Sequence, residues 1–309
     1  MLIKQKIKVP DIITTPQPEC NKCPCYYENN LDIDIYEDCI SINKCCIITN
    51  NYKESLLRIP LNDIDSYKTA FLQKITENIE KVNIPLTENY TVCNNKRFCN
   101  NYNDTIKEIC VNTQSGCNIK CKMCVCDTRF NKKLSDAYYT ILNLIKNNNL
   151  DVIRLNVSGE PFLEKKKAIN YILSLTQADC KNLRIITNGT LLNENDINQL
   201  TMANVNVGIT VSLHSLNPET YKKIENNNFF ERVLKNIDLL NKAGLLANIN
   251  IVAQLDNIDE IYDFCRYFYE RKIHVHLLPV RYCDEHELII NHPNLLRVKQ
   301  DFPQFYGSI

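Results

Sequence analysis

Apolar residues between positions 105 and 283 follow two alternating periods. Six short runs are typical of β-strands, and the segments between them have apolar residues at helical spacing. The predicted strands are 106–111, 152–157, 183–187, 205–213, 247–253 and 273–279, and the predicted helices are 134–147, 162–175, 193–202, 229–243 and 258–271. Such βα units in succession predict an α/β fold with a parallel sheet and right-handed crossovers.

The predicted strands carry polar residues on one face. Within 205–213 every second residue is apolar, and the alternate positions hold Asn206, Gly208, Thr210 and Ser212. Because helices cover the apolar face, the polar face is expected to line a wet interior. A closed eight-stranded barrel fills its interior with branched apolar side chains, so the pattern predicts an open, partial (β/α)6 TIM-like barrel that holds a polar ligand. An antiparallel sheet with one solvated face is the alternative, which the intervening helices disfavour.

Composition and charge narrow the class of protein. The chain has 309 residues, 44% of them apolar and 23% charged, which is ordinary for a globular protein. Neither a secretory apolar stretch nor a run long enough to span a bilayer is present in the sequence, so a cytoplasmic protein without a membrane partner is expected. Thirty-six basic and thirty-six acidic residues cancel, which argues against generic nucleic-acid binding.

Cysteines divide the chain into unlike parts. Sixteen cysteines in a chain of this size indicate metal or redox chemistry rather than disulfides. We expect a Cys-rich N-terminal module over 1–104 with one helix near 64–82, the barrel over 105–283 and a C-terminal tail over 284–309. The module has enough thiols for an auxiliary iron–sulfur cluster or a zinc site, and the candidate ligands are Cys20, Cys23, Cys25, Cys39, Cys45 and Cys46.

Three further cysteines follow the first predicted barrel strand. Cys117, Cys121 and Cys124 have CxxxCxxC spacing. Three thiolates can hold three irons of a cubane cluster and leave the fourth iron open for a ligand. Zinc is the alternative, and it would recruit Cys126 or a distant residue as a fourth ligand.

Polar or small residues follow the other predicted strands. Parallel α/β sheets bind ligands outside the carboxyl ends of their strands, so these positions are expected to meet at one rim. The candidates are Gly159 and Glu160, Thr187 and Asn188, Ser212, Gln254 and Asn257, and Leu278 and Pro279. Each segment alone is a weak signal, and their joint placement after successive strands is a strong one.

Residues 105–283 resemble the radical S-adenosylmethionine (radical SAM) enzymes, and are most similar to the branch that contains peptide maturases and the molybdopterin-precursor cyclase. The resemblance rests on the three cysteines, on Ser-Gly-Glu-Pro at 158–161 in place of the family's usual Gly-Gly-Glu-Pro, and on the segments 187–190 and 212–224. It implies a [4Fe-4S] cluster on the cysteines, S-adenosylmethionine on the open iron, and an electron donor such as ferredoxin or flavodoxin. It also implies a 5′-deoxyadenosyl radical that abstracts hydrogen from a substrate.

The resemblance further implies a role for each cofactor-binding candidate. By this likeness Gly159 and Glu160 hold the methionine amino group, and Thr187, Asn188 and Ser212 contact the ribose or the methionine carboxylate. Gln254 and Asn257 occupy a region of further ribose or carboxylate contacts, while Leu278 and Pro279 flank the adenine. Met123 stands where the family often has an aromatic residue against the cofactor.

The substrate is not encoded in any motif, and no catalytic residue is identified. The main hypothesis is a radical SAM enzyme that modifies a peptide or protein, with the N-terminal module presenting the substrate or holding a second cluster. One alternative is radical chemistry on a small molecule or nucleoside. A second alternative, from another class, is a non-catalytic iron–sulfur or zinc binding module.

Overall fold

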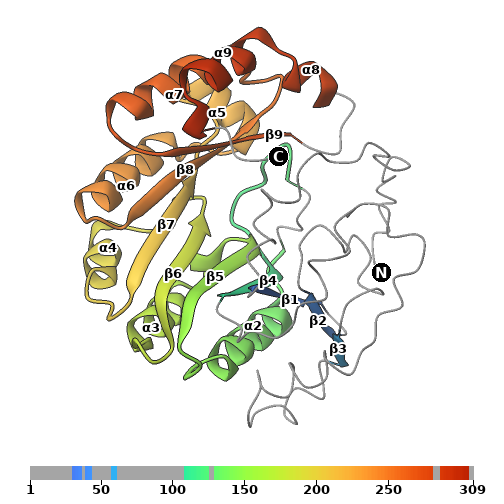
Figure 1. Ribbon diagram of the computed structural model, residues 1–309, viewed down its shortest axis with the longest axis vertical. Coiled ribbons are helices and arrows are strands. Elements are labelled where there is room, and N and C mark those ends of the chain that lie inside the picture. Colours follow the sequence, from blue (N-terminus) through green and yellow to red (C-terminus); the bar gives the residue numbers. More distant parts are fainter. Residues whose placement is uncertain are drawn as a thin grey trace.

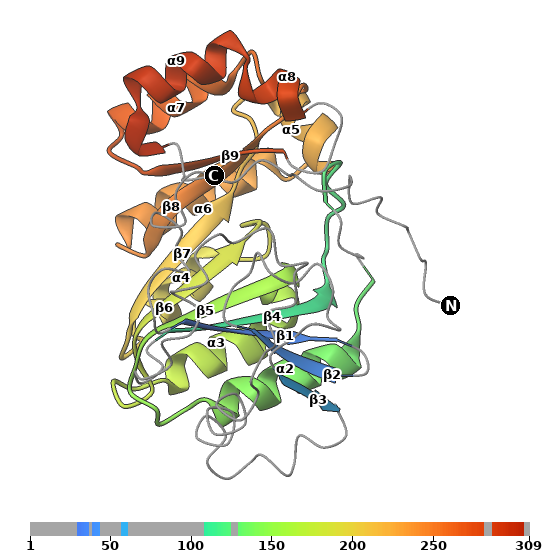
Figure 2. The same cartoon turned by 45° about the vertical axis from the view of Figure 1, so that its right-hand side comes forward.

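A single curved sheet organises the computed structural model, which describes residues 30–36, 39–43, 57–60, 108–124, 129–280 and 286–305. Its strand order is β3-β2-β1-β4-β5-β6-β7-β8-β9 (Figures 1 and 2). The strands are β1 (Asn30–Ile35), β2 (Cys39–Asn43), β3 (Leu57–Pro60), β4 (Glu108–Gly116), β5 (Leu150–Gly159), β6 (Cys180–Thr187), β7 (Asn206–Ser212), β8 (Leu246–Ala253) and β9 (Val275–Pro279). All neighbours from β4 to β9 are parallel, and the sheet stays open, as predicted for a partial barrel.

Helices follow most of the parallel strands and lie along the convex side of the sheet (Figure 1). They are α2 (Lys132–Leu144), α3 (Lys165–Ser174), α4 (Glu194–Leu200), α5 (Pro218–Glu225), α6 (Phe230–Lys242), α7 (Ile261–Glu270), α8 (His286–Ile290) and α9 (Pro293–Asp301), with short 3₁₀ helices η5 (Pro161–Glu164) and η6 (Pro303–Phe305). Asparagine caps fix several starts: Asn193 and Asp196 form a capping box on α4, and Asn217 caps α5 ahead of Pro218. No described helix has the length and apolarity to cross a membrane.

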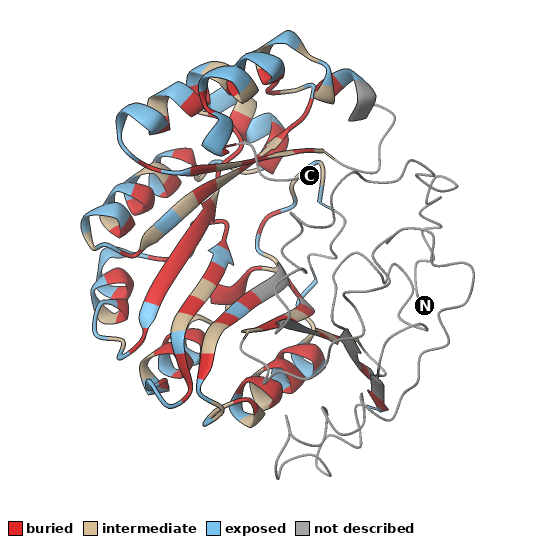
Figure 3. Cartoon of the chain, in the orientation of Figure 1, coloured by how far each residue is buried: buried red, intermediate tan, exposed pale blue. Residues whose placement is uncertain are grey.

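The core lies between the convex face of the sheet and these helices. Leu183 and Ile209 from the strands and Ile141, Val233 and Phe264 from the helices are all at most 2% exposed. Burying an aliphatic or aromatic side chain of this size contributes about 1.5–3 kcal/mol. In Figure 3 the exposed residues, in pale blue, lie mainly on the outward surfaces of the helices. The apolar face of each strand therefore packs against the helices, as the alternation of apolar and polar residues predicts.

The concave face of the sheet is polar, which agrees with the predicted wet interior. Thr210 donates to Asn248 Oδ1 (2.8 Å), and Asn248 in turn donates to Asn250 Oδ1 (2.9 Å). At the amino ends of β6 and β7, Asn206 donates to Asn182 Oδ1 (2.8 Å). Two of these bonds join neighbouring strands and one runs along β8, so the polar side chains on the inner face bond one another rather than standing as isolated solvated groups.

Three strands extend the predicted six-stranded sheet. β1 pairs in parallel with β4, β2 and β3 continue the sheet in antiparallel fashion, and Asn112 of β4 donates to Asp34 of β1 (2.9 Å). Strands from the predicted N-terminal module thus join the barrel sheet itself. The predicted helix near 64–82 lies outside the described residues, and the division at residue 104 stays a prediction.

Candidate active site

The three cysteines lie on a loop that leaves the end of β4. Cys117 and Cys121 are partly buried and Cys124 is exposed. The backbone N–H of Lys122 donates to the carbonyl of Ile224 at the end of α5 (2.7 Å). The Lys122 ammonium also pairs with Asp256 (2.5 Å), after β8. The loop is therefore fixed to two elements that follow more distant strands.

The environment of the thiols disfavours their ionised form. Burial raises the pKa of Cys117 and of Cys121, and nearby carboxyl groups of Glu160 and Glu225 add to the rise at Cys117 and Cys121 respectively. Cys124 lies close enough to raise the pKa of both. Without a cation these thiols stay protonated, whereas bound metal deprotonates a coordinating thiol. Two partly buried thiols and one exposed thiol within electrostatic reach of one another are a suitable donor set for iron.

The cysteine loop can be compared with the two metal centres that its spacing allows. A cubane cluster presents a different iron to each of three thiolates and leaves the fourth iron open for another ligand. A single structural zinc needs a fourth protein ligand, and Cys126, the alternative zinc ligand, lies outside the described residues.

Glu160 is the best-defined acceptor beside the cysteine loop. Its carboxylate is 1% exposed and accepts from Thr187 Oγ1 (2.7 Å), from the Phe162 N–H (3.0 Å) and from the Asn188 N–H (2.8 Å). Burial raises its pKa to about 7, and these three donors oppose the rise. A buried carboxylate with fixed geometry is suited to bind a cationic ammonium group, as the resemblance implies for Glu160.

Gly159 brings Glu160 and the cysteine loop together. A Cβ atom at Gly159 would lie 2.9 Å from the carbonyl carbon of Gly116 and closer still to its oxygen, so only glycine fits here. The same Gly116 oxygen accepts from the Glu160 N–H (2.8 Å). A backbone hydrogen bond therefore joins the start of the cysteine loop to the residue that carries the carboxylate.

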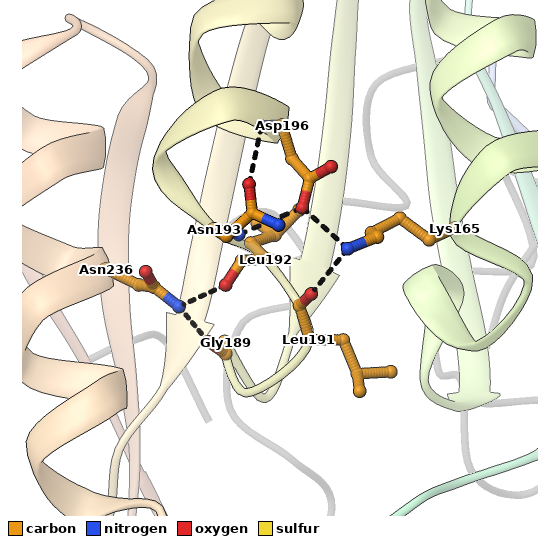
Figure 4. Close-up of polar contacts among 7 residues, drawn as sticks. All are labelled: Lys165, Gly189, Leu191, Leu192, Asn193, Asp196 and Asn236. Carbon is orange, nitrogen blue, oxygen red and sulfur yellow. Dashed lines mark hydrogen bonds and ion pairs between the residues drawn. The ribbon is translucent and has the colours of Figure 1, made fainter.

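Asn188 forms hydrogen bonds both to Glu160 and to the first cysteine of the loop. Its backbone N–H bonds the carboxylate, while its side-chain amide donates to Cys117 Sγ (3.6 Å) and to Asn118 Oδ1 (3.0 Å). The loop that carries Asn188 is held from both sides (Figure 4): Asn236 of α6 donates to the carbonyls of Gly189 and Leu192, both at 2.8 Å, and Lys165 of α3 bonds the carbonyl of Leu191. These polar contacts fix the loop that follows β6. The sequence identified this loop only through the motif at 187–190.

The candidates on β7–β9 surround the same rim with different contacts. Asn257 donates to the carbonyls of His214 (2.8 Å) and Val252 (3.0 Å), so its amide joins the ends of β7 and β8. Gln254 is 4% exposed, and its side-chain nitrogen has no partner among the described residues. Ser212 lies on the inner face beside Asn250. The strand register places Leu278 on the inner face and Pro279 on the buried face.

Glu225 and His214 are site residues that the sequence did not single out. Glu225 ends α5 and is 1% exposed, burial raises its pKa to about 8, and it lies within electrostatic reach of Cys121. Burial lowers the pKa of His214 to about 4, and its Nδ1 accepts from the Val252 N–H (3.1 Å), so the ring is neutral with hydrogen on Nε2. The segment Ser-Leu-His-Ser was recognised as a motif, but only the packing of α5 shows that Glu225 faces the cysteines.

A parallel, open α/β barrel with a three-cysteine loop and a buried carboxylate at its carboxyl rim defines a class of cluster enzymes. The model of the radical SAM superfamily matches residues 111–268, and the chain belongs to this superfamily. It is a radical SAM enzyme, as predicted, and the alternative of a non-catalytic binding module is set aside. Membership implies a [4Fe-4S] cluster and S-adenosylmethionine as cofactors.

Known proteins resemble parts of the chain. It is 26% identical over 191 residues to the GTP 3′,8-cyclase of Synechocystis sp., covering 60% of this chain and 57% of the relative. It is 30% identical over 169 residues to the probable GTP 3′,8-cyclase of Methanocaldococcus jannaschii, covering 52% and 55%. The solved structure of Streptococcus suis SuiB bound to S-adenosylmethionine aligns with a TM-score of 0.48 and 20% identity over 59% of this chain and 42% of SuiB. The chain thus spans little more than half the length of these two cyclases.

Proposed function

We propose that this radical SAM enzyme abstracts hydrogen from a small polar molecule of the nucleoside or nucleotide class, bound against the inner face of the sheet. The observation that supports it best is the group of hydrogen-bonding side chains on β7 and β8 below the rim, formed by Thr210, Asn248 and Asn250. Amide and hydroxyl groups of this kind suit the bases and sugars of nucleosides. The names of the cyclase relatives, which refer to GTP, support the same class.

Different residues at the rim would bind the cluster, bind S-adenosylmethionine and hold these two sites in place. Cys117, Cys121 and Cys124 would hold the cluster, and Glu160 would bind the ammonium group of S-adenosylmethionine. Asn188 would keep the carboxylate and the first thiol in fixed relative positions through its two hydrogen-bond sets. When bound, the cofactors supply a strong hydrogen-abstracting radical, and the protein supplies orientation and exclusion of water.

A peptide or protein substrate, the main hypothesis from the sequence, stays a prediction, as do a ferredoxin or flavodoxin donor and a cytoplasmic location. The N-terminal metal site also stays a prediction. Cys39 begins β2, and the other five candidate ligands, Cys20, Cys23, Cys25, Cys45 and Cys46, lie outside the described residues.

Hydrogen transfer to 5′-deoxyadenosine tests the proposal. Anaerobically reconstituted protein would be mixed with S-adenosylmethionine, dithionite and one candidate at a time, taken from deuterated GTP, guanosine, ATP and a peptide library. We expect deuterium in 5′-deoxyadenosine with a nucleoside or nucleotide, and none with the Cys121→Ala variant. Transfer from peptides alone would overturn the proposal in favour of the peptide hypothesis.

A further inference from the structure

Arg184 is a cation on the inner face of the sheet, on β6. The alternation of β6 buries Leu183 and Ile185 against the helices and turns Arg184 to the concave side, where it is half-buried. Its nearest neighbour on β7 is Gly208, paired in register with it. A Cβ atom at Gly208 would lie 3.0 Å from Arg184 Cζ and closer still to Nη1. The guanidinium therefore lies across β7 in the space left by the missing side chain of Gly208, and a side chain at this position would displace it.

The charge of Arg184 is not balanced within the described part of the chain. Arg154 stands beside it in register on β5 and is paired with Glu108. Arg184 has neither a carboxylate partner nor a hydrogen-bond acceptor among the described residues. Two guanidinium groups side by side with one carboxylate leave a net positive charge on this part of the inner face. A half-buried guanidinium without an acceptor is a ready binding group for phosphate or carboxylate.

The position along the strand relates Arg184 to the cofactor rim. Arg184 precedes Thr187, which bonds Glu160, by three residues. At about 3.3 Å per residue the two positions are about 10 Å apart along the strand. A molecule anchored by an anionic group at Arg184 can therefore extend along the polar side chains of the inner face and present a carbon atom near the rim.

We propose that Arg184, with the space left by Gly208, is the anchor for an anionic group of the substrate, either a phosphate or a carboxylate. This inference rests on the proposed function and adds the chemical class of the substrate: a small polar molecule with at least one anionic group. Arg184 acts through binding and orientation and takes no part in electron transfer.

Equilibrium binding to the reconstituted holoenzyme tests the anchor. The probes are GTP, guanosine and citrate, titrated by calorimetry with S-adenosylmethionine present and dithionite absent. The variants are Arg184→Met and, as a matched control, Lys181→Met, which removes the same charge from the opposite face of β6, where Lys181 is exposed and pairs with Asp151. The electron paramagnetic resonance spectrum of the reduced cluster with S-adenosylmethionine checks that the cofactor site is intact in each variant.

We expect Arg184→Met to weaken binding of GTP or of citrate by roughly 10- to 100-fold, the range for one charge-assisted contact, and to leave guanosine binding unchanged. The probe that loses affinity identifies the anionic group as a phosphate or a carboxylate. Lys181→Met should change neither affinity by more than about twofold. Gly208→Ala, which displaces the guanidinium while keeping its charge, should also weaken the same probe.

Equal affinities of wild type and Arg184→Met for both anionic probes would overturn the inference. An equal loss with Lys181→Met would overturn it too, because the effect would then be one of net charge. The proposed function fails on a different measurement, the absence of deuterium transfer from any nucleoside or nucleotide. Anion binding that depends on Arg184 without such transfer would support the anchor and refute the nucleoside class.

Discussion

The substitution Glu160→Gln distinguishes two effects of the buried carboxylate: the loss of folding stability that its charge causes and the affinity for S-adenosylmethionine that its charge provides. Glu160 is 1% exposed, and its pKa lies at about 7 against an ordinary value of 4.5. An acid that binds its proton more tightly when folded contributes stability that is complete below pH 4.5 and is lost as the pH rises through about 7. At about 1.4 kcal/mol for each tenfold change in proton affinity, the loss amounts to about 3 kcal/mol.

The measurement is a difference between two proteins. Urea unfolding of the cluster-free wild type and of Glu160→Gln, followed from pH 5 to 8, gives a free energy of unfolding for each. Other titrating groups cancel in the difference, which should move by about 2–3 kcal/mol in favour of the variant over this range. Parallel curves for the two proteins would refute the reasoning, because they would mean that Glu160 titrates as an ordinary carboxyl group.

The same Glu160→Gln variant should bind S-adenosylmethionine more weakly than the wild type. In the reconstituted protein, loss of the ionised acceptor removes a charge-assisted contact, so affinity for S-adenosylmethionine should fall by about 10- to 100-fold at pH 8. Wild-type affinity should also fall as the pH drops below about 7, whereas that of Glu160→Gln should stay flat. A wild-type affinity independent of pH between 5 and 8 would contradict the assignment of Glu160 to the ammonium group.

Three further outcomes are expected. Cys121→Ala should abolish the [4Fe-4S] signal that S-adenosylmethionine alters in electron paramagnetic resonance, and a reconstituted cluster signal that remains would indicate an auxiliary site on the N-terminal cysteines. Gly159→Ala should lower the free energy of unfolding by about 1–3 kcal/mol in urea titrations, because its methyl group meets the Gly116 carbonyl. Asn236→Leu leaves two buried loop carbonyls without their donor, so it should cost about 1–3 kcal/mol and raise KM for S-adenosylmethionine. Asn236→Asp should cost at least as much, because it places a buried carboxyl group against the same two carbonyl oxygens.

The central sheet could be predicted because its strands are buried on one face by helices. Each of the six predicted strands overlaps one of β4–β9, and each of the five predicted helices overlaps α2, η5 with α3, α4, α6 or α7. β1 was missed although its apolar and polar residues alternate, because the run is only six residues long and its pairing partner β4 lies about 80 residues away. α5 was missed although Asn217 and Pro218 form a good helix start, because its eight residues were read only as a motif.

The sequence indicated which residues lie near one another at the rim, but it did not indicate which hydrogen bonds they form. The sequence placed Glu160, Thr187 and Asn188 at one rim, and the structure brings all three into direct hydrogen bonding. The Thr187 hydroxyl, however, bonds Glu160 rather than facing an open site, a choice that depends on side-chain geometry. The position of Glu225 beside Cys121 depends on how α5 packs under the cysteine loop, which local sequence does not encode.

The hydrogen bonds at the rim explain why residues remote from the cofactors should affect them. Gly116 and Asn188 both bond Glu160, and Asn188 also bonds the first cysteine, so the thiol and the carboxylate are linked through one short series of contacts. Asn236 supports that series from α6 without approaching Glu160 itself. Because hydrogen abstraction depends on the relative placement of two bound molecules, a small displacement of the Asn188 loop changes both binding sites together. Substitutions at Asn236 should therefore alter cofactor affinity and cluster spectrum in parallel, whereas substitutions at Arg184 should alter neither.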